Sequence, residues 1–315
     1  MVNDASTDDS SRVCHKYAAR DNRIIVIDKP RNEGLELARR SGLDIARGRY
    51  VMHVDSDDWL DNRYVLSTMY RTAEETGADY VEIGMQRVFD RHKWIKKKHK
   101  ASVTGLIEQP ELMDKYFLSF FGVNILPVNI WGKLYRKSCL DRVDIKPAGV
   151  YMGEDLAYNV QLFPHLRRIF IIDATGYNYR YGGGTGGYNR HLLPDIKRLY
   201  ELRWQLIQKY RYDKAADYMR IELKNVLKTA ICRQIEHRIG VRDELIRNIM
   251  TEIDDPLYKS MLLVDENSGF WKDPFVQAYK AGDAEALYEI CRQIVRGERP
   301  KLLLKRVAFG LLSRI

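Results

Sequence analysis

The chain has 315 residues, of which 45% are hydrophobic and 30% are charged. This composition suits a globular protein that can bury a core, and it argues against a largely disordered chain. The formal net charge of +9 favours anionic partners, such as nucleotide diphosphates, nucleic acid or an anionic membrane surface. The charge alone does not choose among these partners.

The four cysteines are far apart and form no Cys-x-x-Cys pair. Their spacing predicts free thiols in a reducing cytosol. No stretch reaches the roughly 18 uninterrupted apolar residues of a membrane-spanning helix. The residues that follow Met1 do not have the charged and then apolar pattern of a signal peptide. We therefore expect a cytoplasmic protein whose membrane contact, if any, is peripheral.

The first part of the chain alternates between predicted strands and predicted helices. Residues 2–6 read as the end of a strand entering a helix, with Ser6 and Asp9 at the capping-box spacing. Further strands are expected at residues 23–28, 50–54 and 80–85, and the helices between them end near residues 20, 48 and 76. This alternation predicts a doubly wound α/β domain with a mostly parallel sheet.

The pattern changes along the second part of the chain. The lysine-rich residues 93–100 suggest an exposed edge strand more than a nucleic-acid patch. Partly helical segments are expected at residues 131–140 and 154–163, a strand at 168–173, and a lid or plain linker at the glycine-rich residues 182–187. Helical patterns dominate afterwards, so we expect an α/β domain over residues 1–189 and a helical region over residues 190–315.

Three carboxylates follow the strand at residues 50–54, on Asp55, Asp57 and Asp58. The carboxyl ends of strands in open α/β sheets are where ligands bind. Hard oxygen ligands favour Mg²⁺ or Mn²⁺, and such a cation would offset the close negative charges. The alternative is an acidic helix start, because carboxylates favour the positive end of the helix dipole.

Three other segments flank this triplet in a fixed order. The sequence reads Asp-Ala-Ser-Thr-Asp at residues 4–8, Asn-Glu-Gly-Leu-Glu-Leu-Ala-Arg at 32–39, and Gly-Glu-Asp at 153–155. The series resembles glycosyltransferase family 2, the inverting enzymes of the GT-A fold, over about residues 2 to 181. The resemblance implies an enzyme that moves a sugar from a nucleotide-sugar onto an acceptor hydroxyl.

The resemblance assigns roles to the residues that match the family motifs. It places Asp4 against the uracil edge of the donor and Arg39 near the base and the active-site loop. Asp55 and Asp57 match the carboxylates that hold the ribose and the metal, with Asp58 in the same cluster. Mn²⁺ or Mg²⁺ and a UDP-sugar donor are therefore expected. UDP is favoured over GDP or dTDP only because members of the family commonly use it.

Asp155 matches the family's general base, which takes the proton of the acceptor hydroxyl as that hydroxyl attacks. The alternative for Glu154 and Asp155 is an ordinary capped helix start after Gly153. Specificity for the donor sugar, the acceptor and the linkage is expected around Trp131, Tyr151 and Met152 and in the helical region. Residues 177–181 resemble the aromatic-rich strand that often closes the family's catalytic domain.

The N-terminus departs from the family pattern. Family members normally have a strand and a helix before the first acidic motif, whereas Asp4 lies three residues after Met1. A βαβ unit takes about 30 residues, so we expect the first β-α unit to be absent, through a late-called start or a fragment. This departure keeps a second interpretation open, a catalytically inactive relative that only binds nucleotide or glycan.

The predicted last helix, residues 301–315, carries an apolar stripe beside lysines and arginines. Such a helix can lie on an anionic membrane or dock on preceding helices. The resemblance implies synthesis of a cell-surface polysaccharide with a glycan or lipid-linked acceptor. Nucleic acid is not an expected partner, because no recognition motif accompanies the positive charge.

Overall fold

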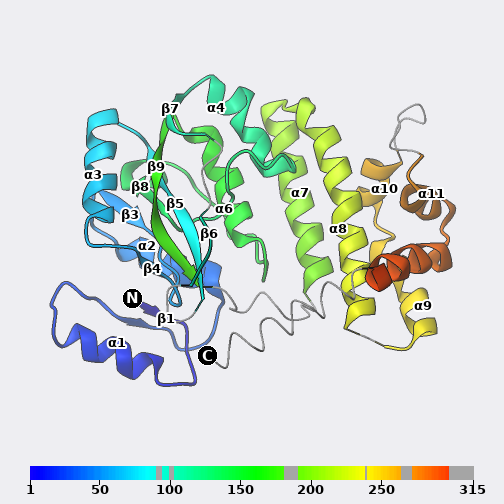
Figure 1. Cartoon of the computed structure of the whole chain (residues 1–315), viewed down its shortest axis with the longest axis horizontal. Coiled ribbons are helices and arrows are strands. Elements are labelled where there is room, and N and C mark those ends of the chain that lie inside the picture. Colours follow the sequence, from blue (N-terminus) through cyan, green and yellow to red (C-terminus); the bar gives the residue numbers. More distant parts are fainter. Residues whose placement is uncertain (90–93, 99–102, 181–190, 238–239, 264–271, 298–315) are drawn as a thin grey trace. The chain divides into compact units, whose positions relative to one another are not determined.

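The computed structural model describes residues 1–89, 94–98, 103–180, 191–237, 240–263 and 272–297. The chain divides into two compact units, Met1–Gly187 and Tyr188–Ile315. The first unit holds all the described strands and the second is helical (Figure 1). The glycine-rich residues 182–187 and the predicted helix at residues 301–315 lie outside the described residues.

A seven-stranded sheet forms the centre of the first unit. Its path is β3-β8-β5-β9-β4, with β6 pairing to β5 and β7 to β9. The strands are β3 (Tyr50–Met52), β4 (Trp59–Leu60), β5 (Tyr80–Phe89), β6 (Trp94–Lys98), β7 (Gly105–Glu108), β8 (Lys133–Arg136) and β9 (Arg168–Arg180). Within this sheet β5 and β9 run parallel and the other pairings are antiparallel. The α/β class is confirmed, but the sheet is mixed where the sequence predicted mostly parallel strands.

Two short strands, β1 (Val2–Asn3) and β2 (Ile27–Asp28), form a separate parallel pair. The strand predicted at residues 23–28 is shorter because its start is a turn, in which the Ile24 amide bonds the Asp21 carbonyl. The capping box predicted at Ser6 is also wrong. The Ser6 amide bonds the Asn3 side chain, and helix α1 (Ser10–Ala18) begins only after Asp9.

The two faces of the seven-stranded sheet bury different sets of side chains, because successive residues of a strand point to opposite faces. Val81, Ile83 and Leu134 face helix α3 (Val65–Thr76), where they join one hydrophobic cluster. The neighbouring residue of β8, Tyr135, faces the other way and bonds Asn159 of helix α6 (Glu154–Leu162). Helices thus cover both faces of the sheet (Figure 1).

The segment from residue 131 to residue 140 is helical in part, as predicted, but the strand within it was not foreseen. The segment forms β8 and then a single turn of helix, α5 (Lys137–Leu140). The reason lies in tertiary pairing, since β8 lies between β3 and β5 and bonds to both. The strand predicted at 168–173 also runs further, to Arg180, because β5 pairs with it over nearly its whole length.

Other predictions for this unit are confirmed within a few residues. Helix α2 (Leu35–Ile45) follows Gly34, and α6 begins at Glu154. The lysine-rich stretch contains β6, which pairs with β5. Two short helical segments, α4 (Glu111–Asp114) and the 3₁₀ helix η1 (Tyr116–Phe121), had no counterpart in the prediction.

Helix α8 (Ala216–Glu236) organises the second unit, because it contacts each of the other helices named here. Its buried residues Met219, Leu223 and Leu227 recur every four positions and form one apolar stripe. Around it lie α7 (Leu192–Tyr210), α9 (Arg242–Ile253), α10 (Pro256–Leu262) and α11 (Pro274–Ala281). None of the described helices is both long and apolar enough to cross a membrane.

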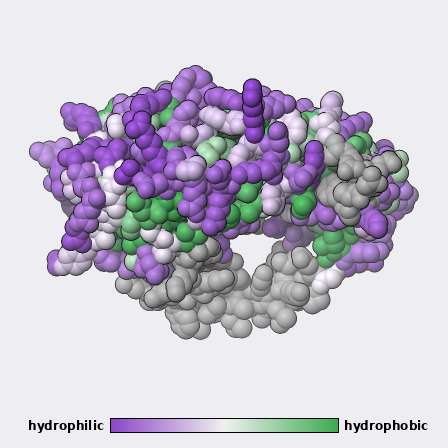
Figure 2. Space-filling view, turned by 90° about the horizontal axis from the view of Figure 1, so that it is seen from above, coloured by the Kyte–Doolittle hydropathy of each residue, from purple (hydrophilic) through white to green (hydrophobic). Residues whose placement is uncertain are grey.

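The face of the molecule seen in Figure 2 is mostly hydrophilic, with hydrophobic residues confined to smaller patches. Some large apolar side chains are nevertheless exposed, and Tyr151 is the most exposed of them at 74%. Tyr151 lies in the segment between α5 and α6, just before the candidate site.

Candidate active site

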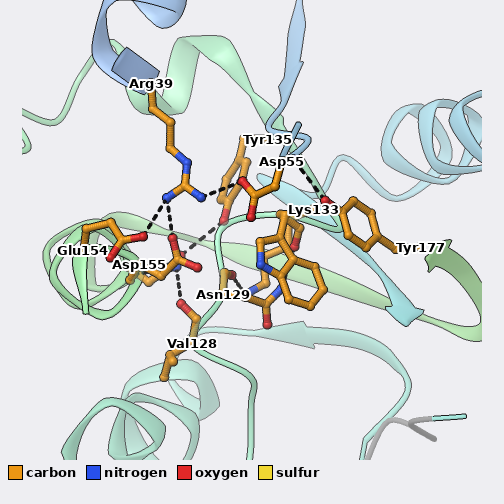
Figure 3. Close-up of polar contacts among 11 residues, drawn as sticks. Arg39, Asp55, Val128, Asn129, Lys133, Tyr135, Glu154, Asp155 and Tyr177 are labelled. Atoms are coloured by element: carbon orange, nitrogen blue, oxygen red, sulfur yellow. Dashed lines mark hydrogen bonds and ion pairs between the residues drawn. The ribbon is translucent and has the colours of Figure 1, made fainter. Parts of the chain in front are cut away.

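One arginine joins carboxylates from two distant parts of the first unit (Figure 3). Arg39 projects from the middle of α2, and its side chain is only 12% exposed. Its Nη2 lies 2.8 Å from Asp55 Oδ1, just beyond β3. Its Nη1 lies 2.5 Å from Asp155 Oδ1 and 3.4 Å from Glu154 Oε1, in the first turn of α6. We call these four residues the Arg39 cluster.

Burial governs the ionisation of the Arg39 cluster. Burial raises the pKa values of Asp155 and Glu154, and the Arg39 charge partly opposes this effect. Burial alone would lower the pKa of Arg39, but the Asp155, Asp55 and Glu154 carboxylates together raise it. The Arg39 guanidinium therefore stays charged, and it offsets the repulsion among the three carboxylates that are packed around it.

Backbone geometry and hydrogen bonds fix the start of α6. Gly153, the residue before the helix, has a φ of +96°, a left-handed conformation that favours glycine. The side-chain Nδ2 of Asn159 donates to the Val128 carbonyl at 2.8 Å and to the Asp155 carbonyl at 3.0 Å. The residues around Val128 and the first turn of α6 are thereby tied together.

A buried lysine of β8 holds the loop at residues 127–131, which contains Val128. Lys133 Nζ donates to the carbonyls of Pro127 at 2.9 Å and Asn129 at 2.6 Å, and it lies 3.7 Å from Glu82. Burial lowers the pKa of Lys133 and raises that of Glu82, and their mutual attraction opposes both shifts. The loop that leads to Trp131 is thus anchored to β5 and β8.

The acidic turn after Asp55 makes separate contacts. The Arg180 amide donates to Asp58 Oδ1 at 2.8 Å, and Arg180 Nε donates to the Asp57 carbonyl at 2.9 Å. The second Asp58 oxygen is buried without a hydrogen-bond partner. Burial raises the pKa of Asp58 to about 6, and the charges of Asp57 and Asp55 add to this shift. The Asp57 side chain is exposed.

The carboxylates of the acidic turn offer a partial set of metal ligands. Within the described residues, no three His, Cys, Asp or Glu side chains come together as a metal site. Mg²⁺, however, is usually held by one or two carboxylates together with substrate phosphates. The unpartnered Asp58 oxygen and the exposed Asp57 carboxylate fit that arrangement, whereas Asp55 is already bonded to Arg39.

Asp4 has protein partners of its own at the end of β1. Its carboxylate accepts hydrogen bonds from the amides of Glu33 at 3.1 Å and Gly34 at 2.7 Å, and Lys29 lies 3.8 Å away. These contacts join β1 to the start of α2. None of these contacts brings Asp4 into the Arg39 cluster, so its role at a uracil edge stays a prediction.

Aromatic side chains lie beside Asp55. The Tyr177 hydroxyl accepts a hydrogen bond from the Asp55 amide at 3.2 Å. Trp131 stacks on Tyr177 and Tyr179 of β9, with ring centres 4.7 Å and 5.3 Å apart. The expected specificity residue Trp131 therefore lies next to the cluster, and the aromatic strand predicted from the sequence supplies its stacking partners.

Sequence reasoning missed two contributors to the site. Glu154 was part of the Gly-Glu-Asp motif but had no predicted role of its own, whereas it is the fourth member of the Arg39 cluster. Tyr177 was noted only as part of an aromatic strand. The acidic pair after Gly153 was the available signal for Glu154, but nothing in the sequence indicated the partner of the Tyr177 hydroxyl.

Comparison with solved structures defines the fold of the protein. The chain resembles residues 1–349 of Staphylococcus aureus TarS, crystallised in complex with UDP-GlcNAc, with a TM-score of 0.63 and 18% identity. The match covers 93% of this chain and 81% of the TarS chain. The protein therefore has the GT-A type of α/β fold followed by a helical region.

Comparison of sequences then gives the family. Residues 1–143 match the model of glycosyl transferase family 2. It is 28% identical over 190 residues to the glycosyltransferase GlyA of Streptococcus pneumoniae and 30% identical over 182 residues to EpsJ of Bacillus subtilis. These matches cover 59% and 57% of this chain, but only 26% of GlyA and 51% of EpsJ.

Proposed function

We propose that the first unit transfers a sugar from a UDP-sugar to an acceptor hydroxyl, with inversion at the anomeric carbon. The observation that supports this most is the Arg39 cluster, which holds the proposed donor-side Asp55 and the proposed base Asp155 on one guanidinium. TarS, which shares the fold, was crystallised with UDP-GlcNAc and with UDP. The match of residues 1–143 to glycosyl transferase family 2 points to the same class of reaction.

In the proposed mechanism Asp155 accepts the proton of the acceptor hydroxyl. Burial raises the pKa of this carboxyl, which makes its ionised form a stronger base. Arg39 keeps the carboxylate oriented through Oδ1, and the fixed start of α6 limits its movement. The hydroxyl oxygen forms the new bond to the anomeric carbon while the bond to the UDP oxygen breaks.

The donor is proposed to lie along Asp55 and the acidic turn, with Asp4 at the uracil. Asp57 and Asp58, with Asp55 nearby, would hold Mn²⁺ or Mg²⁺. When bound, the cation would neutralise negative charge on the departing diphosphate. Arg180 contacts the backbone of the same turn and would support it from β9.

The acceptor is proposed to be a glycan or a lipid-linked glycan of a cell-surface polysaccharide, handled at the cytoplasmic side of a membrane. This part of the proposal is based on the resemblance to the family and on the sequence of residues 301–315, in which an apolar stripe lies beside lysines and arginines. Removal of the chain after Arg299 should release the protein from anionic vesicles. Unchanged sedimentation with those vesicles would remove the proposal of membrane binding.

The transfer reaction can be tested by Mn²⁺-dependent release of UDP from a panel of UDP-sugars. The parent protein should release UDP from at least one donor. Asp155→Asn should lose at least about 100-fold in rate, because an amide cannot take the proton. Asp57→Ala should lose activity through a higher requirement for Mn²⁺.

Asp173→Asn is the matched control, since Asp173 is an exposed carboxylate of β9 outside the site, and its rate should equal that of the parent. Calorimetry of UDP and Mn²⁺ binding separates two failures. Absence of both release and binding would overturn the proposed function. Binding with no release from any donor would instead support the alternative of a binding protein without catalysis.

A further inference from the structure

The loop at residues 127–131 is bonded to the helix that carries the proposed base (Figure 3). The Asn159 side chain of α6 donates to the Val128 carbonyl at 2.8 Å, and it also donates to the Asp155 carbonyl of its own helix at 3.0 Å. Burial raises the pKa of Asp155, and a hydrogen bond from the Ile130 backbone is among the contacts that oppose this shift. A displacement of the loop would therefore change the surroundings of Asp155.

The far end of the same loop is joined to the donor side of the site. Trp131 forms a parallel β-bridge with His53, which lies two residues before Asp55. The Trp131 ring stacks on Tyr177, whose hydroxyl accepts a hydrogen bond from the Asp55 amide. The loop thus connects the segment that carries the proposed donor-side carboxylate with the helix that carries the proposed base.

Lys133 holds two carbonyls of this loop from the side of the sheet. Its ammonium group donates to Pro127 and Asn129, whereas the carbonyl between them accepts from Asn159. An ammonium group has three donors, which leaves one for the Glu82 carboxylate at 3.7 Å. Lys133 is only 1% exposed, so these groups provide its surroundings in place of solvent. The loop is thereby held from two opposite sides, by β8 and by α6.

A buried lysine is an inefficient way to stabilise a sheet. Burial lowers the pKa of Lys133, and the charges of Glu82 and Asp155 oppose this shift. Apolar residues of similar volume can often replace a buried ion pair without loss of stability, so such a pair is weak evidence for a stabilising role. An apolar side chain could not make the two hydrogen bonds to the loop. Those bonds are therefore the distinctive contribution of Lys133.

We propose that Lys133 is a positioning residue for the transfer, because it fixes the loop at residues 127–131 and so sets the place of Asp155 relative to Asp55. The inference rests on the proposed function for the roles of these two carboxylates. Arg39 holds their side chains, whereas Lys133 holds the backbone that lies between their segments. A displacement of about 1 Å at a catalytic group can lower a rate by about 100-fold.

The experiment uses the full chain with the double substitution Lys133→Met and Glu82→Leu. Removing both charges leaves neither of them uncompensated in the interior, whereas Lys133→Met alone would leave the Glu82 charge without its partner. The carbonyls of Pro127 and Asn129 lose their shared donor in the double variant. A thermal melt establishes that the double variant is folded at the temperature of the assays.

Asp79→Ala is the matched control for a loss of stability alone. Asp79 is a buried carboxylate of the same unit that lies just before β5. It accepts hydrogen bonds from the amides of Arg167 and Arg168, at the start of β9. Its removal leaves buried donors unpaired and should lower the thermal midpoint, but it should not displace the loop that Lys133 holds.

Two measurements separate positioning from stability. In the assay of UDP release, the kcat of the double variant should fall by about 100-fold, while its dissociation constant for UDP in calorimetry should stay within about threefold of the parent value. Hydrogen–deuterium exchange at the amides of residues 128–131 should become about tenfold faster in the double variant. Asp79→Ala should keep the kcat of the parent and its exchange at these amides.

Unchanged exchange at residues 128–131 in the double variant would overturn the proposal, as would an unchanged kcat. Equal losses of kcat in the double variant and in Asp79→Ala would also overturn it, because they would show a purely structural role. If the parent releases no UDP, the proposed transfer function fails, but the exchange measurement still decides whether Lys133 holds the loop. Failure of the transfer function is therefore distinguishable from failure of this inference.

Discussion

Arg39 is the residue on which the geometry of the site depends most. It is charged, largely buried and bonded through two nitrogens to carboxylates that lie 16 and 116 positions away in the sequence. A guanidinium can make these bonds at once because its donors form a fixed planar fork. Removing one partner of a buried charged network leaves other charges uncompensated, which typically costs about 3–5 kcal/mol.

We expect Arg39→Lys to keep the positive charge but lose one of the two bonds. UDP release should fall by about 100-fold, since misplaced catalytic groups are costly even at small displacements. Steady-state kinetics and a thermal melt would measure this, with Arg71→Lys on the exposed part of α3 as a control. A rate for Arg39→Lys equal to that of Arg71→Lys would contradict the central place given to Arg39.

Asp58 gives a prediction for the effect of pH on stability. Its pKa in the folded protein is about 6, above the ordinary value of 3.8, mainly because it is buried. Between these values the folded state binds more protons than the unfolded state, so this group lowers stability as the pH rises from about 4 to about 6. Above that window the cost is fully present.

Asp58→Asn should therefore be more stable than the parent at pH 8 and about equal to it at pH 3.5. We expect a gain of about 1 kcal/mol, reduced from the full shift because the group is only half buried. Chemical denaturation in the presence of a chelator at both pH values would measure it. Lower stability of the variant at pH 8 would show that the Asp58 charge is not a cost.

At the scale of elements, the start of α6 sets where Glu154 and Asp155 lie. Gly153 has a φ of +96°, which a residue with a side chain adopts only under strain. Gly153→Ala should lower the free energy of unfolding by about 1–2 kcal/mol and also reduce the transfer rate.

Gly77→Ala is the comparison that separates these two effects. Gly77 ends α3 with a φ of +65°, away from the site, so its replacement should cost similar stability without changing the rate. Equal rates for the two variants, measured at a temperature where both are folded, would show that Gly153 has no special role in positioning Asp155.

The elements also show how far the sequence could be interpreted alone. Helices α2, α3 and α6 could be predicted from local signals, namely a glycine at one end of each helix and the spacing of apolar residues. Their observed ends lie within a few residues of the predicted ones. Strand β8 could not be foreseen in the same way, because the pairing that makes Lys133–Arg136 extended comes from strands 50 or more residues before it in the chain. Long-range pairing overrides local preference at such positions.

The same limit applies to the candidate site. Motif order identified Arg39, Asp55 and Asp155 as candidates, and the structure brings these three together. The order of the motifs did not indicate that Asp4 would accept hydrogen bonds from backbone amides just before α2, or that the Asp57 side chain would be exposed. Those outcomes depend on loop geometry, which spacing along the chain does not encode.

At the scale of the whole molecule, each unit has its own buried core. Met69 of α3 and Leu227 of α8 are both fully buried, one in each unit. Truncating either side chain removes apolar contacts and leaves a cavity, which usually costs about 2–5 kcal/mol.

We expect Leu227→Ala to lower the melting transition of the helical unit and to leave UDP binding by the first unit intact at lower temperature. Met69→Ala should do the reverse, weakening the α/β unit and with it UDP binding. Differential scanning calorimetry with and without UDP would measure both. A single transition that shifts equally in both variants would show that the two cores unfold together.

Strand β5 is bonded on both sides, which has a consequence for dynamics. It pairs with β9 along one edge, and with β8 and then β6 along the other. Its amide hydrogens can reach solvent only if neighbouring strands separate, which amounts to opening the α/β unit as a whole. In a hydrogen–deuterium exchange experiment Val81 and Ile83 should therefore be among the last amides to exchange, and their rates would report the global stability of the unit that carries the site.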